Sequence, residues 1–180
     1  MTGPLARLAL AGTLVGLAGC GMFAKKEPAP PCPRVSLVPD VGQAIGFREG
    51  PGRDLTDVRY RATIADAKGE CSYGRNGLSV DMKVTIVAER GPASTPAPSE
   101  LQYFVALVDP QRRILNKEIF TVKIAFASGQ ERGAVEDEIT IGPARLPDRD
   151  TVPDYTILLG FQLSPEEIER NRRNAGRPGS

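Results

Sequence analysis

The chain has 180 residues, 41% of them hydrophobic, and its 23 Lys and Arg residues nearly balance 22 Asp and Glu residues, for a formal net charge of +1. Nucleic-acid binding draws on a clustered excess of basic side chains, so this balance argues against a nucleic-acid partner. The sequence contains no histidine, which removes the usual general base and the Ser-His and Cys-His nucleophile pairs. We therefore expect one domain that is not an enzyme and needs no cofactor.

The first 19 residues are typical of a secretory signal peptide. Arg7 is the only charged residue among them, and residues 8–18 are almost wholly apolar. This run is too short to span a bilayer, which needs about 20 apolar residues. It ends in Leu17-Ala18-Gly19-Cys20, which resembles the lipobox of bacterial lipoproteins. The alternatives are an ordinary cleaved signal followed by a coincidental cysteine, or a retained helix.

The lipobox resemblance implies that Cys20 carries the membrane anchor. It implies cleavage before Cys20, a diacylglyceryl group on its thiol and an acyl group on the new amino terminus. Two or three acyl chains, at about 0.8 kcal/mol per buried CH₂, make such anchoring effectively permanent. Gly21 follows the cysteine where an aspartate would favour retention in the inner membrane. The resemblance therefore favours the outer membrane of a Gram-negative bacterium, with the protein facing the periplasm.

Residues 20–31 are proline-rich and charged, which predicts a lipidated tether. Beyond it, Cys32 and Cys71 are the two cysteines that remain in a compartment that oxidises thiols. We predict a disulfide between them, at the point where the tether meets the domain. Free or intermolecular thiols are the alternative, and the absence of a Cys-X-X-Cys spacing argues against a redox-active pair.

The next part of the chain alternates apolar and polar residues with a period of two. Residues 34–38, 58–64 and 78–86 are predicted strands, the last two with one face in contact with water. Residues 41–52 are predicted to be a glycine-rich connection, and residues 67–69 a turn, so that Cys71 sits on a short strand of a meander. Asn76-Gly77 is a strong hairpin signal.

The second half of the domain adds further strands, and residues 101–108 form a nearly continuous apolar run that fits a strand buried on both faces. Asp109-Pro110 then begins a predicted type I turn. Later strands are predicted at residues 119–126, 135–141 and 155–163. Roughly seven or eight strands at this spacing predict an all-β, two-sheet antiparallel sandwich over residues 32–163, resembling immunoglobulin or fibronectin type III domains in architecture. A partly open barrel is the alternative.

The chain ends in a predicted short helix over residues 164–173 and a disordered tail over residues 174–180. Ser164 is the predicted N-cap, Pro165 occupies the first helical position, and Glu167 closes a capping box.

Two groups of polar residues are candidates for a site. Arg48, Arg53, Arg59 and Arg61 lie close in sequence around Tyr60, and we predict an interaction surface at Arg59, Tyr60 and Arg61. The alternative is the solvated face of a strand. A second candidate is a calcium site formed by Asp148, Asp150 and Asp154, whose carboxylates offer oxygen ligands. The candidate is weak, because the loop lacks the glycine and the final glutamate of a calcium loop. The alternative for this loop is a simple turn. A second carboxylate pair, Asp54 and Asp57, would be catalytic only with the geometry of a glycosidase.

Several segments look similar to an uncharacterised family of proteobacterial envelope lipoproteins. They are Cys32-Pro33-Arg34-Val35, residues 52–58, 103–110 and 160–167. The resemblance implies no assigned activity and no functional residues. We therefore expect a lipid-anchored binding, scaffolding or assembly-accessory module, with the membrane and another envelope protein as partners. The alternative is a lipid-binding or small-ligand-binding module in envelope transport, which would need an apolar void lined by Phe104, Phe120 and Phe161.

Overall fold

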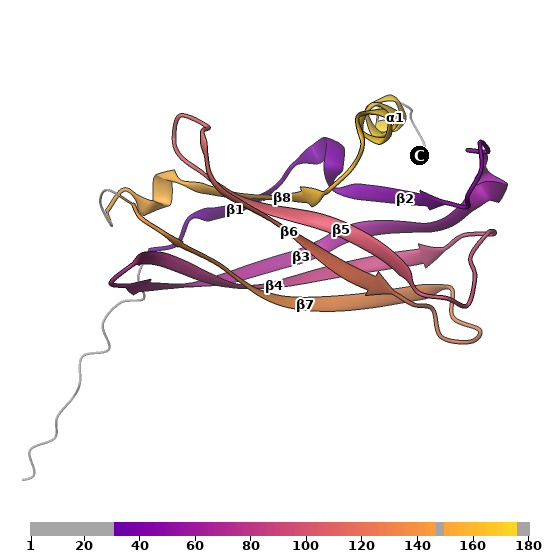
Figure 1. The fold of residues 1–180 in the computed structure, drawn as a ribbon, viewed down its shortest axis with the longest axis horizontal. Coiled ribbons are helices and arrows are strands. Elements are labelled where there is room, and N and C mark those ends of the chain that lie inside the picture. Colours follow the sequence, from indigo (N-terminus) through magenta and orange to yellow (C-terminus); the bar gives the residue numbers. More distant parts are fainter. Residues whose placement is uncertain (1–30, 147–149, 176–180) are drawn as a thin grey trace, which may run out of the picture.

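A computed structural model describes residues 31–146 and 150–175, and these fold into two packed four-stranded sheets with a short C-terminal helix (Figure 1). The first sheet has the strand order β1-β8-β5-β6 and the second the order β2-β3-β4-β7. The predicted all-β sandwich with its short C-terminal helix is therefore confirmed, and the open barrel is not found. The strands are β1 (Arg34–Leu37), β2 (Gln43–Phe47), β3 (Val58–Gly74), β4 (Gly77–Arg90), β5 (Ser99–Val108), β6 (Ile114–Ile124), β7 (Arg132–Ala144) and β8 (Thr156–Phe161).

One strand pair departs from the predicted antiparallel arrangement. The first strand, β1, pairs with β8 in parallel, with Val35 opposite Ile157, while the other pairs are antiparallel. A parallel pair needs a long crossover connection, and here β1 and β8 come from the two ends of the domain. The partner of β1 is therefore a matter of tertiary structure, which no local pattern specifies.

The strand β3 runs straight through the turn that was predicted at residues 67–69, so that prediction was wrong. The pairing of β3 with β4 shifts between Ile64 and Asp66, which is a β-bulge. One extra residue moves the inward-facing positions from even to odd numbers, so Ile64 is buried before the bulge and Cys71 faces inward after it. The interrupted alternation resembles a turn in sequence, although the strand continues. The predicted hairpin at Asn76-Gly77 is confirmed, with Gly74 opposite Gly77.

The strand β2 lies inside the segment that was predicted to be a connection only. It is short and contains Gly46, which packs so closely on the Tyr60 ring of β3 that a Cβ atom would collide with it. Glycine is depleted in strands, so the sequence did not predict one here. A glycine inside a strand often marks a place where another group approaches closely, as the Tyr60 ring does. Between β2 and β3 lies the short 3₁₀ helix η2 (Leu55–Asp57), and η1 (Pro39–Val41) precedes β2.

Buried side chains from both sheets form the core between them. Tyr103 of β5 and Phe161 of β8 are fully buried there, and Leu159 lies beside them in the same core. By contrast, Phe104 packs with Gly160 and Val41 on the other face of its sheet.

The helix α1 (Pro165–Ala175) packs over η1 and β2 through polar contacts. The Asn171 side-chain amide donates hydrogen bonds of 2.9 Å to the carbonyl oxygens of both Asp40 and Gln43. The predicted capping box is confirmed, because Ser164 Oγ accepts a hydrogen bond from the Glu167 N–H and the Glu167 carboxylate accepts one from the Ser164 N–H. Over the described ranges, no helix is both long and apolar enough to cross a membrane.

Candidate binding cleft

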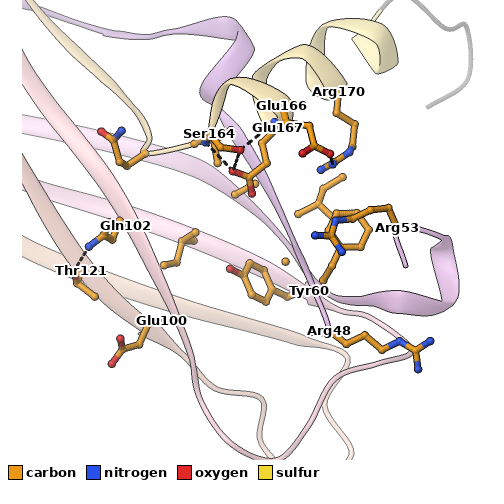
Figure 2. A pocket seen from close by; sticks show the side chains of 17 residues that line it. Arg48, Arg53, Tyr60, Glu100, Gln102, Thr121, Ser164, Glu166, Glu167 and Arg170 are labelled. Carbon is orange, nitrogen blue, oxygen red and sulfur yellow. Dashed lines mark hydrogen bonds and ion pairs between the residues drawn. The ribbon is translucent and has the colours of Figure 1, made fainter. Parts of the chain in front are cut away.

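A cleft of about 590 Å³ opens beside β2, where both sheets and the start of α1 meet (Figure 2). Its walls come from β2, the start of β3, the start of β5 and the first turns of α1. The side chains that give it its chemistry include Ile45, Phe47, Arg53, Tyr60, Gln102 and Arg170.

An aromatic ring that two guanidinium groups approach forms one end of the cleft. The guanidinium carbon of Arg53 lies 5.4 Å from the centre of the Phe47 ring, and that of Arg170 lies 5.0 Å from it. Both distances allow cation–π attraction, which also orients the two cations beside the same apolar surface. Phe47 comes from β2 and Arg170 from α1, so this arrangement exists only when the helix is docked.

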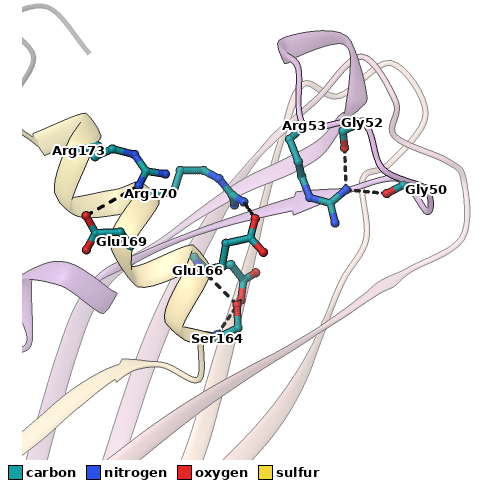
Figure 3. Close-up of polar contacts among 9 residues, drawn as sticks. Gly50, Gly52, Arg53, Ser164, Glu166, Glu169, Arg170 and Arg173 are labelled. Atoms are coloured by element: carbon teal, nitrogen blue, oxygen red, sulfur yellow. Dashed lines mark hydrogen bonds and ion pairs between the residues drawn. The ribbon is translucent and has the colours of Figure 1, made fainter.

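Arg53 is the cleft arginine without an acidic partner among the described residues. Its guanidinium donates hydrogen bonds of 2.7 Å and 2.6 Å to the carbonyl oxygens of Gly50 and Gly52 (Figure 3). In contrast, Arg170 forms an ion pair of 3.1 Å with Glu166, and Arg48 lies 2.5 Å from Asp57. The Arg53 side chain is thus oriented by the loop while its positive charge stays uncompensated.

The carboxylates that line the cleft are already occupied. Glu167 accepts hydrogen bonds of 2.7 Å from both the backbone N–H and the hydroxyl of Ser164. Glu100 pairs with Lys123 at 3.6 Å across the β5–β6 ladder. Because the Ser164 donors are neutral, Glu167 keeps its negative charge, just as Arg53 keeps its positive charge.

Tyr60 contributes a hydroxyl group to the cleft. Its side chain is buried, with 8% of the residue exposed, and the hydroxyl points into the cleft (Figure 2). That hydroxyl has no hydrogen-bond partner within the described part of the chain. Burial raises the pKa of the Tyr60 phenol, Arg59 lowers it to a smaller extent, and Glu167 raises it. The phenol is therefore a neutral donor at physiological pH.

The carboxylate pair Asp54 and Asp57 has a structural role. Asp57 is buried, and its Oδ2 accepts a hydrogen bond of 3.1 Å from the Asp54 backbone N–H, which caps η2. Its Oδ1 is approached by the Arg48 guanidinium without hydrogen-bond alignment, so that contact is an ion pair. A Cβ atom at position 52 would collide with this carboxylate, which explains Gly52.

The predicted surface of Arg59, Tyr60 and Arg61 does not form, because the side chains of a strand alternate between its faces. Tyr60 is buried on the inner face of β3, whereas Arg61 is exposed on the outer face and Arg59 is half-buried there. The structure instead brings Tyr60 together with Arg48 and Arg53, which were in the wider set of arginine candidates.

The remaining predicted sites lie elsewhere. Cys32 and Cys71 are within disulfide distance, with their sulfur atoms 1.99 Å apart and their Cα atoms 5.6 Å apart. Cys20 lies outside the described residues, and so does Asp148 of the calcium candidate. Of its other two members, Asp154 belongs to the 3₁₀ helix η3 (Val152–Asp154) and Asp150 lies just before it. Across residues 31–146 and 150–175, no three acidic or cysteine side chains gather as a metal site would require.

Phe47 and Arg170 were not predicted as parts of the site. Phe47 lies on the strand that was not predicted, and Arg170 was counted only as part of a charged helix. Comparison with protein-family models, curated proteins and solved structures finds no match to this chain. The geometry of the cleft, with two guanidinium groups near one aromatic ring and a free phenol, suits the binding of an anionic oxygen.

Proposed function

We propose that this chain is a non-catalytic binding module that a lipid on Cys20 anchors to the outer membrane, facing the periplasm. In this role it acts as a scaffolding or assembly-accessory lipoprotein for another envelope protein. The observation that carries the proposal is the position of the cleft relative to the point where the tether would join the domain.

The tether would join at the end of the sandwich opposite the cleft. The Tyr73 hydroxyl, at the far end of β3, donates a hydrogen bond of 3.0 Å to the Pro31 carbonyl, while Tyr60 of the cleft lies near the start of the same strand. A strand rises about 3.3 Å per residue, so these two ends of β3 lie roughly 40 Å apart. A domain anchored through residue 31 can present its cleft away from the membrane.

The alternative function, carriage of a lipid or apolar ligand, requires a cavity between the sheets. The packing described above counts against it, because Phe161 is fully buried in the core and Phe104 lies on the other face of its sheet. The scaffolding proposal needs no internal cavity, since its cleft is open and polar at the edge of the sandwich.

The anchor is tested by labelling cells with a palmitate analogue. We expect the Cys20→Ala variant to lose the label and to be released from the membrane or to accumulate as the precursor. Cys71→Ala serves as a control, because a cysteine that carries no lipid should leave labelling intact. Labelling that persists in Cys20→Ala would contradict the anchor.

The partner is tested by photo-crosslinking in living cells from the exposed positions Gln102, at the cleft, and Arg75, at the hairpin tip near the opposite end. We expect one defined envelope protein to be crosslinked from position 102 and not from position 75. Recovery of lipid alone, or of the same products from both positions, would contradict the proposal.

A further inference from the structure

We infer that the cleft binds an extended acidic segment of the partner protein, with a carboxylate at Arg53 and a hydrogen-bond acceptor at the Tyr60 hydroxyl. This inference rests on the proposed function and goes further by naming the chemistry that the partner must present. Three observations support it: the free charge of Arg53, the unpartnered hydroxyl of Tyr60 and the backbone groups of Ile45 at the outer edge of β2.

The first observation is that Arg53 is prepared for an anion. The carbonyl oxygens of Gly50 and Gly52 and the Phe47 ring position its guanidinium from the protein side. None of these contacts neutralises the charge. A guanidinium presents a planar fork of donors that matches a carboxylate, so an acidic side chain is its natural ligand.

The second observation is the buried Tyr60 side chain. Its hydroxyl points into the cleft, and no described residue accepts its hydrogen bond. A polar group held at the bottom of a cleft without a partner gains when a ligand supplies an acceptor. A phenol is neutral at physiological pH, and burial, which raises the Tyr60 pKa, keeps it so, which leaves its O–H free to donate to an oxygen acceptor.

The third observation explains why an extended chain is the occupant. The Ile64 N–H donates to the Gly42 carbonyl, and antiparallel ladders alternate, so the backbone groups of Ile45 face away from β3. The carbonyl of Gln43, at the same edge, already accepts a hydrogen bond from Asn171 of α1. Ile45 lines the cleft at this edge of the sheet, so its backbone groups are the ones that an extended chain in the cleft can bond.

The test uses the full lipidated chain in detergent and two short fluorescein-labelled peptides, one alternating glutamate with valine and the other glutamine with valine. Fluorescence anisotropy measures the two affinities. We expect the acidic peptide to bind about tenfold more tightly, because a hydrogen bond to a charged group is worth that much, and its binding to weaken as salt is added.

Three variants localise the binding. We expect Arg53→Gln to weaken binding of the acidic peptide about tenfold, and Tyr60→Phe to weaken it about fivefold while keeping the buried ring. Arg75→Gln removes the same charge from the hairpin at the opposite end and should leave the affinity unchanged. Urea unfolding of each variant confirms that the domain is folded during the measurement.

Equal affinity for the two peptides, or equal losses in Arg53→Gln and Arg75→Gln, would overturn the inference. Mass mapping of the crosslinked partner segment shows whether only the acidic ligand is wrong or the proposed function is wrong as well. A partner captured at position 102 through a segment without Asp or Glu would refute the acidic ligand and leave the scaffold proposal standing. A partner segment rich in acidic residues supports both.

Discussion

The hydroxyl of Tyr103 donates a hydrogen bond of 2.8 Å to the Asp137 carboxylate and so joins the two sheets through their interior. Tyr103 belongs to β5 and Asp137 to β7, and the Tyr103 ring stacks on Phe120 with 5.4 Å between ring centres. Burial raises the pKa of the Tyr103 phenol, and the bond to the charged Asp137 raises it further. The phenol therefore stays protonated and remains the donor across the physiological range.

Removing this bond should destabilise the sandwich. We expect Tyr103→Phe to lower the free energy of unfolding by about 1–2 kcal/mol, since Asp137 loses its partner while the ring remains. Urea denaturation measures the loss. A double-mutant cycle with Asp137→Ala provides the control, because the two changes should be non-additive if they break one interaction. Additive losses would contradict the assignment.

We predict that the Asp109 carboxyl makes the free energy of unfolding depend on pH in the acidic range. Burial favours its neutral form, but hydrogen bonds from the backbone and guanidinium of Arg113 and from the Gln111 backbone outweigh burial and hold the Asp109 pKa below its ordinary value of 3.8. This stabilisation is therefore complete above the unfolded-state pKa, and it is lost as the pH falls through the lower folded-state pKa.

The variant that tests this linkage is Asp109→Asn, compared with Glu70→Gln on an exposed position. We expect the Asp109 variant to be less stable than wild type at neutral pH and to show a smaller loss of stability below about pH 4. Urea midpoints across a pH series provide the measurement. If the curves of Asp109→Asn and wild type run parallel through the acidic range, Asp109 is not the linked group.

Gly46 should not accept a side chain. A Cβ atom there would lie 2.5 Å from Cζ and 2.8 Å from Cδ1 of the Tyr60 ring, so alanine must displace the ring. We expect Gly46→Ala to lower the free energy of unfolding by about 1–3 kcal/mol, as overpacking does. Gly74→Ala is the matched control, because a Cβ atom at Gly74 meets nothing within 4 Å. Equal losses in both variants would show that the close approach has no effect.

The pair Cys32 and Cys71 should stabilise the domain by closing a long loop. With 39 residues of sequence separation, the chain-entropy model sets an upper value of about 4 kcal/mol. We expect the double variant Cys32→Ala/Cys71→Ala to unfold at a lower urea concentration than wild type. Reductant should destabilise wild type and leave the stability of the double variant unchanged. Non-reducing mass mapping checks the linkage itself, and two free thiols in the mature protein would refute it.

Features that depend on local chemistry could be predicted from the amino-acid sequence. Alternation of apolar and polar residues predicted the strands at residues 58–64 and 78–86, since a half-buried strand needs this period. Asn76-Gly77 predicted the hairpin, and Ser164 with Glu167 predicted the capped helix, because each motif satisfies its own backbone groups.

Which distant groups meet depends on how the strands and the helix pack in three dimensions. The bulge at residues 64–66 changed which side chains of β3 face inward, and the packing of Gly46 on Tyr60 created a strand that local propensity disfavours. Arg53, Phe47 and Arg170 form one site because a loop, a strand and a helix converge there. That convergence depends on the packing of the two sheets and the docking of α1, for which no local pattern carries a signal.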